Sequence, residues 1–332
     1  MHSTVIITVV IVVLAVAFDF INGFHDTATA VATTITTRAL SPGVAIALCA
    51  VFNFIGAFLG TAVAKTVGDN IINHEFMPQW VIIGVLISCV VWNIITWYFG
   101  IPSSSSHALI GSLIGGGVVY NGTIKVIQWN NVFDEVVVWL ILGPLIGFIL
   151  GYFIIVILNW ILKPFKLAGV NKVFLKLQIV ASAFMALNHG SNDAQKSMGI
   201  ITMALISGGF ISTFEVPNWV IVACALAMAL GTSIGGKKII RTMGSGMTKL
   251  TPVKGFAAQM GAATSILGAT LFHAPVSTTQ VITTTIMGVG ASENLKSVKW
   301  GVAKDIIWAW VLTIPLSAVI SGAVVFVMKI FI

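Results

Sequence analysis

Two short polar stretches lie inside long apolar segments of this chain. Residues 22–26 read Asn-Gly-Phe-His-Asp, and residues 189–193 read His-Gly-Ser-Asn-Asp. A carboxylate inside an apolar segment is costly enough that it usually marks a functional site. The two stretches also align, because Asp26 and Asp193 are 167 positions apart in a chain of 332 residues. The sequence therefore indicates two related halves, each carrying one acid.

The composition places these apolar segments in a lipid bilayer. Hydrophobic residues make up 58% of the chain and charged residues 8%, whereas a soluble protein carries roughly 25% charged residues. The net charge of +7 could indicate nucleic-acid binding in a soluble protein. Here the basic residues fall in short loops, where they set the topology instead. We expect an integral membrane protein in contact with the lipid bilayer, with no nucleic acid partner and no cofactor.

The placement of lysine predicts the orientation of the segments. Loops 163–176 and 237–254 carry basic residues and no acid, so we place both on the cytoplasmic side of the plasma membrane. Two apolar spans separate these loops, which agrees with both lying on one side. Counting back from them, the segment with Asp26 runs inward and the segment with Asp193 runs outward. Both termini are then expected outside the cell.

Matched segments that run in opposite directions predict an inverted-topology repeat of residues 1–170 and 171–332. A second pair of motifs supports this division. Residues 102–107 (Pro-Ser-Ser-Ser-Ser-His) and residues 275–280 (Pro-Val-Ser-Thr-Thr-Gln) are 173 positions apart. We therefore expect an all-α polytopic membrane protein built from two inverted repeats with interrupted helices. This design is typical of secondary transporters, whose substrate site lies between the repeats.

Each Pro-Ser/Thr motif precedes a short segment rich in small residues. These segments are shorter than the roughly 20 residues that cross a bilayer, so we predict two re-entrant helical hairpins. Proline ends the first half-helix, and the Ser/Thr run opens the second, where free N–H groups and hydroxyls can bind an anion. A simpler interpretation is that the hydroxyls only cap the helices. The expected donors are Ser104, Ser105, Ser106, Ser277, Thr278 and Thr279.

The two acids are expected to bind a coupling ion and not the anion. An ionised carboxylate repels an anion unless a cation lies between them. We predict either a Na⁺ site or a proton carried by the carboxyl group. Gly23 and Gly190 would let the helices unwind and expose carbonyl groups to the ion. The predicted side-chain ligands are Asp26, Asp193, Asn22 and Asn192.

Other polar residues lie in the same segments. Lys196 follows Asp193 by one helical turn and is expected to pair with it or to oppose the charge of the substrate. Asp19 could join the site, although nothing in the second half matches it. Histidines in the motifs are expected to donate hydrogen bonds to an anion or to the backbone, and metal binding is the alternative. These histidines are His25, His107, His189 and His273.

The four motifs resemble those of the inorganic phosphate transporter (Pit) family. Residues 23–28 and 190–194 are similar to its duplicated Gly-x-Asn-Asp-x-Ala motif. Residues 101–107 and 274–280 are similar to its duplicated Pro-x-Ser-x-Thr-His motif. The resemblance covers nearly the whole chain. The chain lacks the long hydrophilic central loop of eukaryotic members, so it is most similar to prokaryotic permeases.

The resemblance implies symport of inorganic phosphate with Na⁺ or H⁺ and assembly as a homodimer. It implies that Asp26 and Asp193 are essential and that the hairpin tips, including His107 and Gln280, bind phosphate. His25 stands where the family usually has Asn, and Gln280 stands where it usually has His. Fewer protonatable groups near the site favour Na⁺ over H⁺ as the coupling ion.

Other functions fit parts of the pattern. A sulfate permease of the same fold would use the same hydroxyls, and a proton-coupled metal–phosphate symporter would take a complexed anion. An intramembrane aspartyl protease would need a Gly-x-Gly-Asp sequence, which neither acid motif has. An anion channel would not concentrate its substrate. We predict a transporter and not an enzyme.

Overall fold

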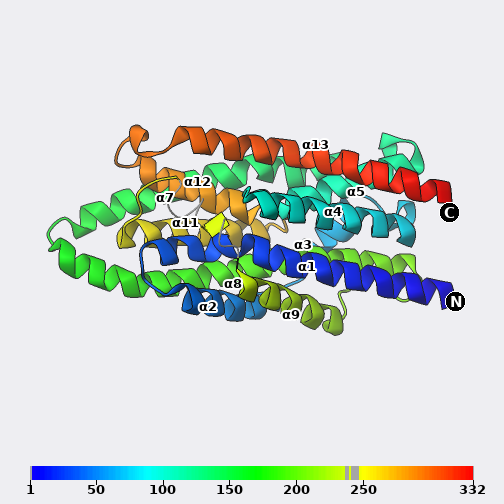
Figure 1. Cartoon of the computed structure of the whole chain (residues 1–332), viewed down its shortest axis with the longest axis horizontal. Helices are drawn as coiled ribbons and strands as arrows, with labels where there is room; N and C mark the ends of the chain where they lie inside the picture. The colour runs from blue at the N-terminus through cyan, green and yellow to red at the C-terminus, as the bar shows by residue number, and fades with distance from the viewer. Residues whose placement is uncertain (1, 236–238, 241–246, 332) are drawn as a thin grey trace.

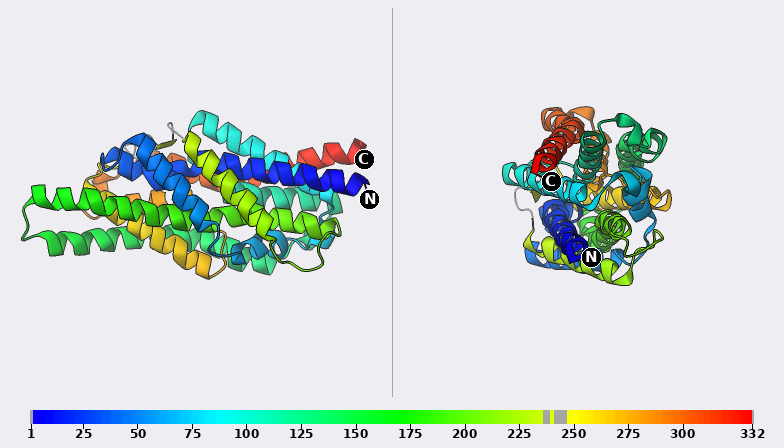
Figure 2. Two further views of the ribbon diagram at one scale, coloured as in Figure 1. Left: turned by 90° about the horizontal axis from the view of Figure 1, so that it is seen from below. Right: turned by 90° about the vertical axis from the view of Figure 1, so that its right-hand side faces the viewer.

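The computed structural model describes residues 2–235, 239–240 and 247–331, which are almost entirely helical and contain no β-strand. The helices form an elongated bundle with both chain termini at one end (Figure 1 and Figure 2). Short 3₁₀ and π turns link some of them. The helices are α1 (His2–Thr36), α2 (Pro42–Gly56), α3 (Ala62–Lys65), α4 (Gln79–Phe99), α5 (Ser105–Asn121), α6 (Trp129–Asn131), α7 (Val138–Leu162), α8 (Leu167–Ser207), α9 (Asn218–Ile234), α11 (Pro252–Leu271), α12 (Thr278–Ala291) and α13 (Trp300–Phe331).

Several of these helices are suited to a bilayer. Among the described residues, the helical segments long and apolar enough to cross a membrane are Thr4–Thr36, Gln79–Phe99, Trp129–Leu162, Leu167–Ser207 and Trp300–Phe331. Large apolar side chains cover their outer surfaces, as Ile141 and Val319 do on α7 and α13. Exposed apolar surface of this kind marks contact with a partner or with lipid. The prediction of an all-α polytopic membrane protein is confirmed.

The two polar stretches do not interrupt their helices. α1 and α8 run without a break through residues 22–26 and 189–193, so the predicted unwinding at Gly23 and Gly190 is wrong. A continuous helix keeps every backbone group bonded, which an apolar environment strongly favours.

The two glycines instead allow other helices to cross very closely. A Cβ atom on Gly23 would lie 2.4 Å from the carbonyl oxygen of Met228 on α9. A Cβ atom on Gly190 would lie 2.3 Å from the carbonyl oxygen of Asn53 on α2. Both distances are far shorter than a van der Waals contact. Because glycine has no side chain, α1 and α8 can pack directly against the backbone of α9 and α2.

α4 and α5 form one helical hairpin, and α11 and α12 form another. The end of α5 meets the segment before α4, because Asn121 Nδ2 donates to the carbonyl oxygen of Phe76 at 3.0 Å. The first turn of α11 meets the segment after α12 through an ion pair of 2.8 Å between Lys254 and Glu293. In Figure 1 the first hairpin occupies the right half of the bundle and the second the left half. Each chain segment thus enters from one end and returns to it.

Matching helices of the two halves make matching contacts. α1 packs on α9 as α8 packs on α2, and α5 packs on α13 as α12 packs on α7. α4 packs on α1 as α11 packs on α8. α1 begins at the end of the bundle that holds the termini, and α8 begins at the opposite end (Figure 2, left). These contacts and directions support the division into inverted repeats, which we retain as a proposal.

The buried polar residues lie between two hydrophobic clusters. One cluster contains Phe18 of α1 and Ile200 of α8. The other contains Val31 of α1 and Met185 of α8. Along both long helices the polar stretches fall between these clusters. The fold therefore buries its acids in the middle of the bundle, with apolar packing on either side.

Candidate functional site

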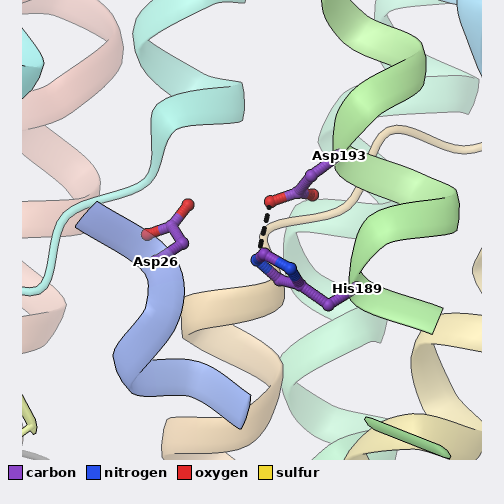
Figure 3. A group of neighbouring side chains, drawn as sticks. All are labelled: Asp26, His189 and Asp193. Carbon is purple, nitrogen blue, oxygen red and sulfur yellow. Dashed lines mark ion pairs between the residues drawn. The ribbon is translucent and has the colours of Figure 1, made fainter. Parts of the chain in front are cut away.

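The two acids of the aligned motifs face a common space. Asp26 on α1 is 2% exposed, and Asp193 on α8 is fully buried. One oxygen of each carboxylate and one ring nitrogen of His189 all lie within 4.8 Å of one another. Figure 3 shows the two carboxylates approaching from separate helices, with His189 beside Asp193. The structure thus brings together two residues that are half a chain apart.

Asp26 binds hydroxyl groups from both hairpins. Ser105 Oγ at the start of α5 donates to Oδ2 at 3.0 Å. Thr279 Oγ1 in the first turn of α12 donates to Oδ1 at 3.1 Å. His25 Nδ1 lies 2.8 Å from Oδ1. The first acid is therefore held by a neighbour on α1 and by the N-terminal turns of two other helices.

Asp193 has a different set of partners, which includes a charged one. Lys196 Nζ donates to Oδ1, and His189 Nε2 lies 3.2 Å from Oδ2. Thr278 Oγ1 donates to Oδ2 at 3.3 Å. Thr278 corresponds to Ser105, since the two are 173 positions apart. Each acid thus accepts a hydrogen bond from the hairpin of its own half.

Lys196 links the second acid to the first hairpin. The side chain is fully buried, and its pairing with Asp193 confirms one of the two roles that the sequence suggested. Nζ also donates to Ser106 Oγ at 2.5 Å, and Ser106 Oγ donates to the carbonyl oxygen of Val276 at 2.9 Å. The sequence did not predict the contact between Lys196 and Ser106. The one-turn spacing of Asp193 and Lys196 indicates only a partner on the same helix.

Two of the predicted anion donors act as helix caps. Ser104 Oγ accepts a hydrogen bond from His107 N at 3.2 Å, and Ser277 Oγ accepts one from Gln280 N at 3.3 Å. These bonds satisfy backbone donors that the first turn of a helix leaves free. Both hydroxyls cap a helix as acceptors and keep their own protons to donate, so their role as anion donors stays a prediction. The other four hydroxyls point toward the acids or bridge the hairpin tips.

His107 and Gln280 occupy equivalent positions in the two halves and contact one another. His107 Nδ1 and Gln280 Nε2 are 3.3 Å apart, and both side chains are buried. The sequence treated them as separate phosphate ligands. The structure shows them as a pair that joins the first turns of α5 and α12, and their role as phosphate ligands stays a prediction.

The two asparagines predicted as ion ligands make no hydrogen bond to the carboxylates in the described part of the chain. Asn192 Nδ2 donates to Thr270 Oγ1 at 2.9 Å and to the carbonyl oxygen of Ala274 at 3.1 Å. It thereby fixes the tip of the second hairpin. The amide of Asn22 has no hydrogen-bond partner among the described residues. Asn22 lies one helical turn before Asp26, and Asn192 adjoins Asp193, so the four-residue ion site stays a prediction.

The donor set fits a hard cation. Carboxylate and hydroxyl oxygens suit such ions, whereas imidazole suits transition metals such as zinc. His189 Nε2 lies 3.2 Å from Asp193 Oδ2 and His189 Nδ1 lies 3.1 Å from Asn53 Oδ1, so the carboxylate oxygens of Asp26 and Asp193 are the ligands best suited to such a cation. The N-termini of α5 and α12 also offer backbone N–H groups and positive dipole ends, which favour an anion. One small region can thus bind a cation and an anion together.

Comparison with known proteins decides the family. The model of the phosphate transporter family matches residues 22–321. The chain belongs to this family. A probable low-affinity inorganic phosphate transporter of Bacillus subtilis (strain 168) is 47% identical, with 99% of each chain covered. A protein of the same description from Rhizobium meliloti (strain 1021) is 43% identical, with 97% of each chain covered.

A solved structure has the same fold as this member of the phosphate transporter family. It is described as the sodium-dependent phosphate transporter, with a TM-score of 0.87, 98% of this chain and 100% of that chain covered, and 24% identity. The relatives are transporters and not enzymes. The family resemblance seen in the sequence and the prediction of a transporter are both confirmed.

Proposed function

We propose that this chain imports inorganic phosphate across the plasma membrane by symport with a cation, with Na⁺ favoured over H⁺. The observation that carries the proposal is the meeting of two buried acids with the hydroxyl-bearing N-termini of α5 and α12. Relatives named inorganic phosphate transporters support the substrate. The fold shared with a sodium-dependent transporter supports the choice of ion.

Charge balance explains why the two solutes would bind together. The hydroxyls of Ser105, Thr278 and Thr279 now donate to carboxylates. Phosphate would add negative charge beside two buried acids, which is strongly unfavourable without compensation. A cation bound by the carboxylates would offset this repulsion and free the hydroxyls for phosphate. Binding of each solute would then favour binding of the other, which is the thermodynamic basis of symport.

Alternating access would take place at the interface of the proposed repeats, residues 1–170 and 171–332. Contacts between the halves converge on the site. Ser106 of the first hairpin bonds to Val276 of the second, and Thr279 of the second bonds to Asp26. Opening the site toward either side would require some of these contacts to break, so they are the expected gates.

We propose that the cytoplasm lies at the end of the bundle opposite the termini. The loop after α7 and the first turns of α8 lie at that end (Figure 1), and they carry Lys163, Lys166, Lys172 and Lys176. The positive-inside rule then places both termini outside the cell. Loop 237–254, which supports the same orientation, lies partly outside the described residues.

The deciding experiment is uptake of radiolabelled phosphate by proteoliposomes under an imposed Na⁺ gradient or an imposed pH gradient. Uptake driven by the Na⁺ gradient supports the proposal, and uptake driven only by the pH gradient would assign the coupling to H⁺. Competition by arsenate but not by sulfate excludes a sulfate permease. A strict requirement for a divalent cation would point to a metal–phosphate symporter. Absence of uptake under both gradients would contradict phosphate symport.

The family resemblance also implies a homodimer, and we retain that assembly as a proposal. The mass of the protein in lipid nanodiscs, measured by light scattering or native mass spectrometry, tests it. A mass of one chain at all concentrations would contradict the dimer without affecting the transport proposal.

A further inference from the structure

Asp19 is a third acid buried in the bundle. It lies on α1 two helical turns before Asp26 and is fully buried, and neither carboxylate oxygen completes a hydrogen bond within the described part of the chain. Ser197 of α8 and Cys224 of α9 approach the carboxylate. The Ser197 hydroxyl is itself fully buried and has no hydrogen-bond partner of ordinary geometry among the residues that the structure describes. A buried carboxylate in such surroundings needs a cation or a proton to be stable.

Asn22 adds an amide to the same face of α1. It follows Asp19 by three residues, and this spacing places two side chains on one side of a helix. The amide is fully buried, and its oxygen and nitrogen both lack partners among the described residues. Such atoms are rare in folded proteins and each calls for an explanation, such as an ion or a water. Asn22 therefore points to a ligand on this face of α1, where Asp19 lies three residues before it and Asp26 four residues after it.

The register between α1 and α4 brings a second unpartnered amide to the same level. α1 packs against α4, and two hydrogen bonds between them join residues 71 positions apart, namely Thr8 with Gln79 and His25 with Thr96. Asn22 and Asn93 are also 71 positions apart. Asn93 on α4 therefore lies at the same height along the bundle as Asn22 on α1, as paired residues do in two parallel helices. Both polar atoms of Asn93 are buried and lack partners in the described structure.

We propose that Asp19, Asn22 and Ser197 form a second Na⁺ site, distinct from the cluster of Asp26 and Asp193. Hard cations take oxygen ligands, and these residues supply a carboxylate, an amide and a hydroxyl oxygen. Asn93 is placed to add a further amide oxygen. The site lies between Asp26 and the end of the bundle that holds the termini, which is the outer side in the proposed orientation. The inference rests on the proposed cation coupling and adds one ion to it.

The test is binding of radiolabelled Na⁺ to the purified full-length protein in the absence of phosphate. The wild-type protein is expected to show two classes of site, and Asp19→Asn is expected to lose one class and keep the other. Ser197→Ala is expected to raise the half-saturating Na⁺ concentration of that class roughly fivefold, because it removes one neutral ligand. Ser182→Ala is the matched control, since Ser182 lies about four turns earlier on α8 and donates to the carbonyl oxygen of Ala30.

Each outcome either supports or overturns the second site. If Asp19→Asn does not fold, Ser197→Ala and Asn22→Ala carry the test, with gel filtration as the check on folding. Binding curves identical to those of the wild-type protein overturn the proposal. A variant that changes only the pH dependence of stability, with unaltered Na⁺ binding, assigns Asp19 to a proton and overturns the Na⁺ site. Because the assay uses neither phosphate nor transport, a failure of the proposed phosphate import would leave its result intact.

Discussion

At the scale of single residues, the two aligned acids are chemically different. Asp193 is paired with a buried lysine, whereas Asp26 is held by two hydroxyls and a histidine. A carboxylate that already has a full positive charge beside it attracts a further cation less strongly. The charge of Lys196 therefore makes the two halves of the cluster unequal, and we keep both acids as the proposed ligands of the coupling ion.

Asp26→Asn should abolish transport while the protein still inserts and folds. The amide keeps the size of the carboxylate and removes its charge. Loss of one charge-assisted interaction costs about 1.5–3 kcal/mol, so Na⁺-driven phosphate uptake should fall roughly ten- to hundredfold. Uptake by proteoliposomes of matched protein content measures the effect. Asp69→Asn, at a partly exposed acid near the outer end, is the control and should transport normally. Wild-type uptake by Asp26→Asn would contradict the assigned role.

Lys196→Met should destabilise the fold, because it leaves Asp193 buried without its counter-charge. Breaking a buried ion pair from one side costs about 3–5 kcal/mol, which denaturant unfolding in detergent can measure. The double variant Lys196→Met/Asp193→Leu removes both charges and should regain most of that stability without regaining transport. If the single variant is as stable as the wild-type protein, Lys196 is not the counter-charge of Asp193.

At the scale of helices, the motif glycines act as crossing points. Gly23 and Gly190 lie where a side chain would collide with the backbone of α9 and of α2. The crossing helix α9 also has a glycine at the contact with α1. A Cβ atom on Gly231 would lie 1.9 Å from the carbonyl oxygen of Phe20. Two long helices and two shorter ones are thereby locked into one tightly packed group.

Gly190→Ala should therefore weaken the protein even though alanine favours helix. Forcing a methyl group into a packed contact costs typically about 1–3 kcal/mol. Gly169→Ala on the same helix is the matched control, because nothing lies within 4 Å of its added Cβ, and it should be neutral or slightly stabilising. Thermal unfolding of both variants measures the difference. Equal stability of the two would show that the crossing tolerates a side chain.

The sequence predicted the starts of α5 and α12 well and the course of the acid-bearing helices less well. Proline and the Ser/Thr runs are local signals, and they correctly indicated where α5 and α12 begin. A glycine inside an apolar helix is ambiguous, because it can mark a break or a close crossing. Only the partner helix resolves this ambiguity, and the partners of Gly23 and Gly190 lie far away in the chain.

At the scale of the whole molecule, the motif spacing and the loop lysines predicted the opposite directions of α1 and α8. They could not predict which hydroxyl meets which acid. Ser105 reaches Asp26 across 79 positions, and Thr279 reaches it across 253. Such pairings depend on how both hairpins pack together, and no local pattern records that packing. The sequence therefore proposed separate anion and ion subsites where the structure shows one cluster.

The proposed orientation predicts the sides from which surface residues can be labelled. Lys166→Cys lies at the basic end. It should react with an impermeant thiol reagent only in permeabilised cells, where the reagent reaches the cytoplasmic side of the membrane. Glu75→Cys lies toward the opposite end and should react from outside intact cells. Both positions are exposed, and the native cysteines Cys49, Cys89 and Cys224 are buried, so background labelling should be low. The reverse pattern would invert the topology and the direction assigned to transport.

The bond between Thr279 and Asp26 also has a consequence for biosynthesis. The ribosome delivers this acid to the membrane well before its hydroxyl partner, which lies 253 positions later in the chain. During most of translation, the nascent protein must shelter this acid without the second hairpin. Assembly of the transport site is thus a late step in the maturation of the chain. A truncated product without the second hairpin would present an incompletely bonded carboxylate inside the bilayer, which is costly.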